Sequence, residues 1–204
     1  MRKVALITDG WRRLFTYAWP AGILQRIRET GEDVNLYIFN STGNWSRDAG
    51  YNRAEYNIYN LPELSDFDGI ILELNNISSP AVLADVISNA KRSGRPVVSI
   101  ANELGDFYYV GIDNYSAMKQ VIAHLHEVHD CKKFWLLVGA QDNYESSCRL
   151  QGMLDYAKEH KIKIDKDDIW YGSFDYKSGL EGYKHLWDRH KELPDAVICI
   201  NDNV

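Results

Sequence analysis

The chain has 204 residues, of which 45% are hydrophobic and 25% are charged, and its formal net charge at pH 7 is −6. This is enough apolar material to bury the core of one large domain or two small ones. The acidic balance argues against a nucleic-acid surface, because such surfaces gather Lys and Arg to displace the counterions of phosphates.

The cysteines and the apolar runs indicate in which cellular compartment the protein is expected, the cytoplasm. Cys131, Cys148 and Cys199 are far apart and form no CxxC pair, which is typical of reduced cytosolic thiols. No apolar run approaches the roughly 20 residues of a membrane span. The run at residues 4–7 ends at Thr8 and Asp9, too early for a signal peptide. We therefore expect a cytoplasmic protein that does not associate with membranes.

Strands and helices are predicted to alternate through the first half of the chain. Short apolar runs predict strands at 4–8, 34–39, 69–74, 96–101 and 108–112. Helices are predicted at 18–29, at 80–92 and at 116–128. Gly31 is expected to close the first in a left-handed conformation, and Ser79 to cap the second. Residues 40–51 are polar and are predicted to form a loop.

The same alternation begins again in the second half. Strands are predicted at 134–138, 169–171 and 196–200, and helices at 145–160 and 178–190. The pattern predicts an α/β fold with two doubly wound parallel-sheet lobes that meet near residues 130–133. Residues 1–115 are assigned to an N-terminal lobe, and residues 116–204 to a hinge helix and a partial C-terminal lobe. The strand at 196–200 is expected near a sheet edge, where exposed apolar strands favour association.

Five pieces of sequence then suggest a family. They are VGIDNY at 110–115, CKKFWLLVG at 131–139, RLQGM at 149–153, GSFD at 172–175 and PDAVICIND at 194–202. In this order they resemble the lactose/galactose repressor (LacI/GalR) family of bacterial regulators over nearly the whole chain. The resemblance implies a type I periplasmic-binding-protein-like fold, with a ligand cleft between two lobes. The family carries a helix-turn-helix before its first strand and continues beyond the point that matches Val204, so we expect this chain to lack the DNA reader and to have an incomplete second lobe.

Candidate ligand-binding residues follow from two arguments that agree. Ligands of open parallel sheets bind beyond the carboxyl ends of the strands, and the resemblance implies contacts on several of the same segments. The candidates are Asp9, Trp11, Arg12, Tyr17, Asp113, Asn143, Glu145, Arg149, Phe174, Asp175, Asn201 and Asp202. Of these, Arg149 is implied by the family to hold ligand hydroxyl or carboxylate oxygens, for which a guanidinium presents paired donors in one plane.

Several candidates have an alternative structural role. Asp113 either accepts hydrogen bonds from sugar hydroxyls or caps the helix that follows it. Phe174 either stacks on a ligand or is a core residue at a strand end. Asn201 and Asp202 either recognise hydroxyls or form a turn.

The first loop is rich in aromatic and basic residues. Phe15 and Trp19 are expected to belong in part to the core face of the first helix, whereas Trp11, Arg12 and Tyr17 are expected to face the cleft. This composition leaves nucleosides and acidic sugars open as ligands beside the sugar that the family implies.

Metal and catalytic chemistry are not expected. His124, His126 and His129 lack metal-site spacing and are interpreted as an exposed helix face, and no cofactor is predicted. The sequence contains no GxSxG nucleophile elbow, no phosphate-binding P-loop, and no GxGxxG after the first strand.

We therefore expect a non-enzymatic sensor of a small molecule, with a sugar as the leading candidate, in a LacI-like transcription regulator. Such a protein would form a homodimer and would contact DNA only through a separate domain. An alternative is the N-terminal sensor of a signalling protein with a C-terminal output domain, such as a GGDEF diguanylate cyclase. An enzyme on a doubly wound sheet is less favoured, because the catalytic motifs are missing.

Overall fold

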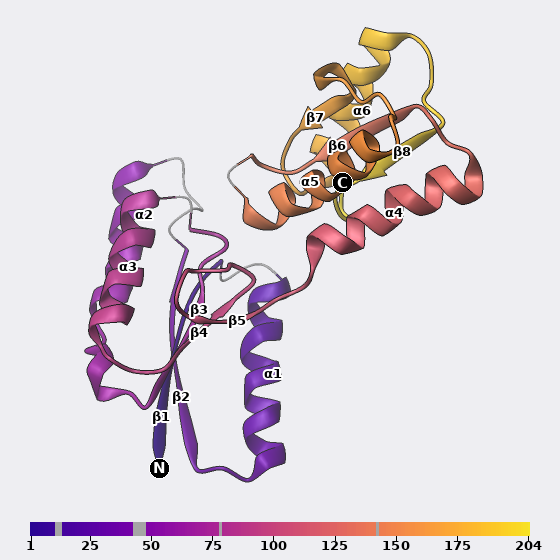
Figure 1. Cartoon of the computed structure of the whole chain (residues 1–204). Coiled ribbons are helices and arrows are strands. Elements are labelled where there is room, and N and C mark those ends of the chain that lie inside the picture. The colour runs from indigo at the N-terminus through magenta and orange to yellow at the C-terminus, as the bar shows by residue number, and fades with distance from the viewer. Residues whose placement is uncertain (11–13, 43–47, 78, 142) are drawn as a thin grey trace. The chain divides into compact units, whose positions relative to one another are not determined.

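The computed structural model describes residues 1–10, 14–42, 48–77, 79–141 and 143–204, and the side chains of 14–16 are not described. The chain divides into two compact units, Met1–Gly111 (unit 1) and Ile112–Val204 (unit 2). Each unit is built on its own parallel sheet (Figure 1).

Unit 1 contains a five-stranded sheet in the order β2-β1-β3-β4-β5, in which all neighbouring strands are parallel. Its elements are β1 (Arg2–Asp9), α1 (Leu14–Thr30), β2 (Val34–Ser41), α2 (Ala49–Glu55), the 3-10 helices η1 (Tyr56–Asn60) and η2 (Leu64–Asp66), β3 (Gly69–Glu73), α3 (Pro80–Arg92), β4 (Val97–Ile100) and β5 (Tyr108–Val110). Figure 1 shows α1 on one side of the strands, and α2 and α3 on the other. Helices on both sides are the doubly wound arrangement that the alternating pattern predicts.

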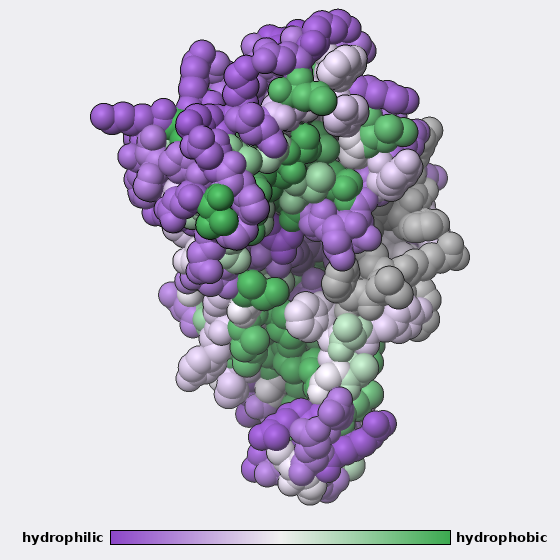
Figure 2. Space-filling model, turned by 90° about the vertical axis from the view of Figure 1, so that its right-hand side faces the viewer, coloured by the Kyte–Doolittle hydropathy of each residue, from purple (hydrophilic) through white to green (hydrophobic). Residues whose placement is uncertain are grey.

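The principal core of unit 1 lies on the side of α3. Ile7, Ile70 and Leu72 from the strands pack there with Val86 and Ala90 of α3, and all are buried. The predicted helix signals are confirmed: the Ser79 side chain accepts a hydrogen bond from the Val82 backbone N–H, and Gly31 has a φ of 65° after α1. The edge strands stay partly exposed, since Tyr108 of β5 keeps 73% of its surface. Figure 2 shows a strip of apolar residues on the surface of this unit.

Two predictions for unit 1 were wrong in detail. The segment predicted as a loop at 40–51 gives way to α2 at Ala49, because the Asp48 side chain accepts hydrogen bonds from the backbone N–H groups of Gly50 and Tyr51. The first helix begins at Leu14 rather than near residue 18, and it continues across Pro20.

Unit 2 contains a three-stranded parallel sheet in the order β7-β6-β8. Its elements are α4 (Asn114–His129), β6 (Phe134–Val138), α5 (Tyr144–Glu159), the 3-10 helix η3 (Lys166–Asp168), β7 (Ile169–Tyr171), α6 (Tyr176–His190) and β8 (Ala196–Cys199). One face of β6 packs on Ile122 of α4 and Met153 of α5, and the other packs on Leu186 of α6. The apolar strand β8 lies at the edge of this sheet, as predicted.

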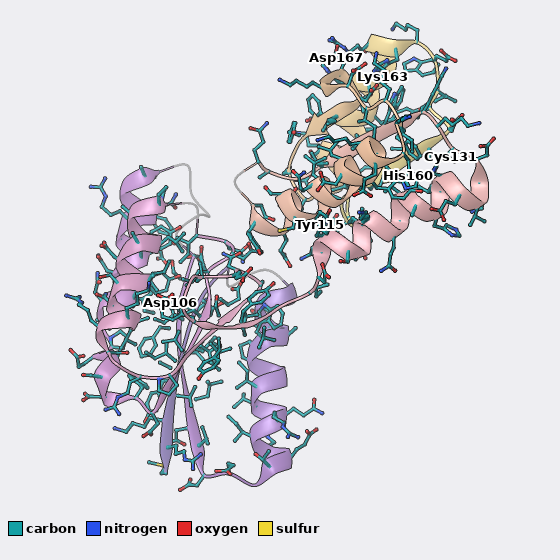
Figure 3. The ribbon with its side chains drawn as sticks, in the orientation of Figure 1. Asp106, Tyr115, Cys131, His160, Lys163 and Asp167 are labelled. Atoms are coloured by element: carbon teal, nitrogen blue, oxygen red, sulfur yellow. The ribbon has the colours of Figure 1, made fainter. Side chains whose placement is uncertain are left out.

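Helices α4 and α5 lie side by side, and Figure 3 labels Tyr115 where they meet. The Tyr115 hydroxyl donates to Asp155 at 3.0 Å. A Cβ atom at Gly152 would lie 2.3 Å from the backbone oxygen of Tyr115, so only glycine permits this approach. This packing assigns α4 to unit 2. The two units divide at Gly111, before α4 rather than near residues 130–133.

Candidate functional site

The carboxyl ends of the unit 2 strands form one edge of the sheet, as they must in a parallel arrangement. The backbone N–H of Gly172 donates to Val138 at 3.0 Å, and that of Ile200 donates to Leu137 at 2.9 Å. The segments that follow the three strands therefore lie close together. Most of the ligand-binding residues predicted for unit 2 are on these segments or at the start of the helices that follow them. This is the edge at which open α/β sheets bind ligands.

Arg149 lies in the second turn of α5 and is half-buried. Its Nε donates to Asn114 Oδ1 at 2.7 Å, and its Nη1 donates to the backbone oxygen of Ile200 at 2.8 Å. Both acceptors are uncharged. Among the described residues, Nη2 has no hydrogen-bond partner and the guanidinium forms no ion pair. Since a guanidinium has five N–H donors, two contacts fix this side chain and leave donors for oxygen acceptors.

Asn114 is the residue that sequence reasoning missed. It is the first residue of α4, it is only 5% exposed, and its Nδ2 donates to Glu145 Oε1 at 3.4 Å. Asn114 therefore joins two predicted site residues, Glu145 and Arg149, that both belong to α5. The VGIDNY segment contained this residue, but the prediction used only the preceding Asp113.

Three of the predicted ligand-binding residues cap helices. The side chains of Asp113, Asn143 and Asp175 accept hydrogen bonds from backbone N–H groups two or three residues into α4, α5 and α6. These bonds lower the pKa of Asp113 and of Asp175 below the ordinary value, and Asp175 also accepts from the Ser173 hydroxyl at 2.7 Å. The capping role foreseen as an alternative for Asp113 thus extends to two further positions.

Phe174 and Asn201 also show their structural alternatives. The Phe174 ring is half-buried against the unit 2 core and occupies the space where Gly139 would carry a Cβ, with ring atoms 2.3 Å from that position. Asn201 Oδ1 accepts from the backbone N–H of Asn203 at 3.0 Å, which is a turn contact. Asp202 is exposed in the same turn.

A polar groove of about 350 Å³ lies on the side of α5 that faces β7. It is lined by Ala140, Gln141, Ser146, Ser147, Leu150, Gln151 and Tyr171. Arg149 does not line this groove, because it contacts the segment that follows β8. The groove and the Arg149 cluster are therefore separate features of unit 2.

In unit 1, buried polar side chains gather at the carboxyl end of β1. The Thr8 hydroxyl donates to Glu73 at 2.8 Å, and the Tyr59 hydroxyl donates to the Thr8 backbone oxygen at 2.9 Å. Asp9 and Ser41 are fully buried beside them. Burial, together with the nearby Asp9 carboxylate, raises the pKa of Tyr59 well above its ordinary value. Of this cluster, only Asp9 was predicted as a site residue.

The other unit 1 candidates lie in the first loop and helix. Tyr17 is 53% exposed on α1, and Trp19 is half-buried as expected for a residue with a partly structural role. Trp11 and Arg12 lie outside the described residues, as does the side chain of Phe15.

The part of the chain that the structure describes contains no group of three or more His, Cys, Asp or Glu side chains that could hold a metal ion. His124 and His129 are exposed, with their Nε2 atoms 3.2 Å apart, and His126 contacts the Tyr156 hydroxyl at 3.1 Å. None of the described helices combines the length and apolar character that a membrane crossing requires.

The sequence of the chain is similar to those of known transcription regulators. No protein-family model matches the chain. Catabolite control protein A of Staphylococcus xylosus is 31% identical over 149 residues, which are 72% of this chain and 43% of the relative. The chain thus spans less than half of that relative's length. Such relatives are regulators rather than enzymes, in line with the class expected from the sequence.

Solved structures share the fold. A sugar-binding transcriptional regulator of the LacI family from Escherichia coli, complexed with phosphate, superposes with a TM-score of 0.74 at 20% identity. This match covers 98% of our chain and 68% of that structure. The transcriptional regulator CelR in complex with cellobiose superposes with a TM-score of 0.68 at 24% identity, covering 97% of our chain and 58% of its own. In sequence and in fold, this chain is therefore a relative of the LacI-family regulators and matches part of their periplasmic-binding-protein-like domain.

Proposed function

We propose that the chain senses a small molecule, most simply a sugar, for a transcription regulator, and that the Arg149 cluster of unit 2 holds the ligand. The proposal rests on the hydrogen-bonding pattern of the Arg149 guanidinium. Two neutral acceptors fix its guanidinium at the carboxyl-end edge of the sheet. Among the described residues, Nη2 has no hydrogen-bond partner, so its N–H donors can bind a ligand. Sugar hydroxyl oxygens fit donors of this kind, because the planar fork addresses neighbouring oxygens together.

The relatives support this class of ligand. The E. coli LacI-family structure is described as sugar-binding, and CelR was solved with cellobiose. These properties belong to those proteins, and a sugar ligand for this chain is our inference.

The remaining predicted site residues stay proposals. Among the unit 2 candidates without a cap or turn contact, Asp202 is exposed and Glu145 and Phe174 are half-buried, so each has some surface to offer a ligand. Four further candidates already accept a hydrogen bond in a helix cap or a turn, and we propose that each offers its second polar atom to the ligand: Asp113, Asn143, Asp175 and Asn201. In unit 1 the proposed contacts are Asp9, Trp11, Arg12 and Tyr17.

A thermal-shift screen tests the proposal. A ligand that binds only the folded state stabilises it by about 2.7 kcal/mol at a hundred times its dissociation constant. We expect neutral mono- or disaccharides to raise the melting temperature, with sugar phosphates and nucleobases as comparison sets. If no sugar shifts the transition while a nucleobase does, the sugar assignment fails. If nothing in the three sets shifts it, the sensing proposal for this chain fails.

The proposal also includes a homodimer and contact with DNA through a separate domain. It rests on the likeness to LacI-family regulators, and no described residue is assigned to either contact. Light scattering up to high micromolar concentration tests the first part. A protein that remains monomeric throughout would contradict it.

A further inference from the structure

Helix α5 carries an acid and a base at a spacing that ordinarily pairs them. Glu145 and Arg149 are four residues apart, with the acid on the N-terminal side, which is the favourable order for an ion pair on a helix. Yet the described contacts of Arg149 are to Asn114 and Ile200, and none is to Glu145. Something in unit 2 keeps the two apart.

The side-chain amide of Asn114 lies between them. Its oxygen accepts from Arg149 Nε at 2.7 Å, and its nitrogen donates to Glu145 Oε1 at 3.4 Å. A side-chain amide provides an acceptor and a donor on two separate atoms of one short side chain. Arg can only donate and an ionised Glu can only accept, so the two neighbours fix the orientation of the amide. Because Asn114 is 5% exposed, water cannot easily take its place.

We propose that Asn114 is a positioning residue that keeps Arg149 from closing onto Glu145, so that the outer donors of the guanidinium remain available to a ligand. The second half of this statement rests on the proposed function, whereas the first concerns the protein alone. A sugar hydroxyl suits the resulting cluster, because it can accept from the guanidinium and donate to a carboxylate. Removing the amide should let the helix pair form and occupy Arg149 internally.

The first half is tested without any ligand, by the rate at which phenylglyoxal modifies Arg149 in the full chain, followed by peptide mass spectrometry. The variants are N114A, E145Q and N114A/E145Q, with Q151A as a matched control on α5. We expect N114A to slow modification about two- to fivefold, the size of a modest ion pair. E145Q alone and the double variant should react at the wild-type rate, as should Q151A.

Two results would overturn the inference. One is an N114A variant that is modified at the wild-type rate, or that is slowed as much as the N114A/E145Q variant is. In either case Glu145 would not be the group that competes for Arg149. The other is faster modification in E145Q alone, which would mean that the pair already exists in the native protein. This second variant keeps the test decisive if circular dichroism shows that N114A does not fold.

Cellobiose titration supplies the ligand readout. N114A should weaken cellobiose binding when Glu145 is present and have little effect in the E145Q background, a coupling that general loss of structure would not produce. If N114A lowers cellobiose affinity equally with Glu145 present and in the E145Q background, Asn114 has only a structural role. If wild type does not bind cellobiose, this sugar is not the ligand, while the modification rates still decide whether Asn114 separates the pair.

Discussion

At the residue scale, polar side chains after parallel strands serve two purposes in this protein. Asp113, Asn143 and Asp175 were singled out because strand ends are ligand sites, and each proves to start the helix that follows. The same sequence position attracts both roles, because in a βα unit the strand end is also the helix start. Polarity alone therefore cannot separate a cap from a ligand contact.

The capping role of Asp175 can be measured. Replacing Asp175 with Ala should cost about 1 kcal/mol of unfolding free energy at pH 7, a typical value for a lost cap. Its pKa is lowered in the folded protein by hydrogen bonds from Ser178 and Ser173, from an ordinary value of 3.8. A lowered folded pKa contributes stability that is complete above the unfolded pKa and is lost as the pH falls through the folded value.

The difference between wild type and D175A should therefore be full at neutral pH and shrink below about pH 4. Urea melts at a series of pH values measure it. D202A, which removes an exposed carboxylate with no cap to lose, is the control. A difference that stayed constant down to the lowest pH would show that the carboxylate charge does not contribute to the cap.

At the element scale, the contact between α4 and α5 depends on one glycine. A Cβ at position 152 would meet the Tyr115 backbone oxygen at 2.3 Å, and backbone atoms cannot move aside without shifting a helix. We expect G152A to destabilise the protein by about 1–3 kcal/mol, although Ala is the better helix former. G22A in α1 is the matched control, since nothing lies within 4 Å of a Cβ there. It should be neutral or stabilise by up to about 1 kcal/mol. Thermal or urea unfolding compares them, and equal effects would contradict the packing argument.

The 3-10 helix η1 is held to β1 by the Tyr59 hydroxyl, which donates to the Thr8 backbone oxygen at 2.9 Å. Since Tyr59 is 3% exposed, Y59F should cost about 1 kcal/mol for the lost buried hydrogen bond. Tyr51 is 44% exposed, so Y51F should change stability by less than about 0.5 kcal/mol. Urea melts distinguish the two, and a neutral Y59F would show that this contact contributes nothing net.

The order of strands and helices could be predicted because their apolar periodicity is local. Helix α2 was missed because it has no buried residue that could reveal an apolar period. The 3-10 helices η1 and η2 were missed because five and three residues are too short to show one. The bond between Thr8 and Glu73 joins residues 65 positions apart, and it forms only because β1 and β3 are neighbours. Asn114 was missed for the same reason: its partners lie on a different helix. Arg149 was found through its motif, and its fixed orientation became visible only with the acceptors supplied by Asn114 and Ile200.

At the scale of the whole molecule, the exposed edge of the unit 2 sheet predicts association. Strand β8 pairs with β6 on one side, and Val197 on it is 38% exposed. An apolar edge strand offers its free backbone groups to another chain. We expect the 204-residue chain to associate with rising concentration in size-exclusion chromatography with light scattering, and V197K to reduce this association.

L61K is the control for that experiment, because Leu61 is 75% exposed in unit 1 but lies on no strand. If both lysine variants reduce association equally, the effect reflects net charge rather than the β8 edge. If neither does, the edge of this sheet is not the contact.

The role of Arg149 in holding the ligand is tested most directly by isothermal titration calorimetry. The sugar that gives the largest thermal shift is titrated into wild type, R149A and R149K. We predict that R149A remains folded and loses about 1.5–3 kcal/mol of binding free energy, or roughly 10- to 150-fold in affinity. R149K should recover little, because an ammonium lacks the planar fork that reaches neighbouring oxygens. Unchanged affinity in a folded R149A would contradict the claim that this guanidinium holds the ligand.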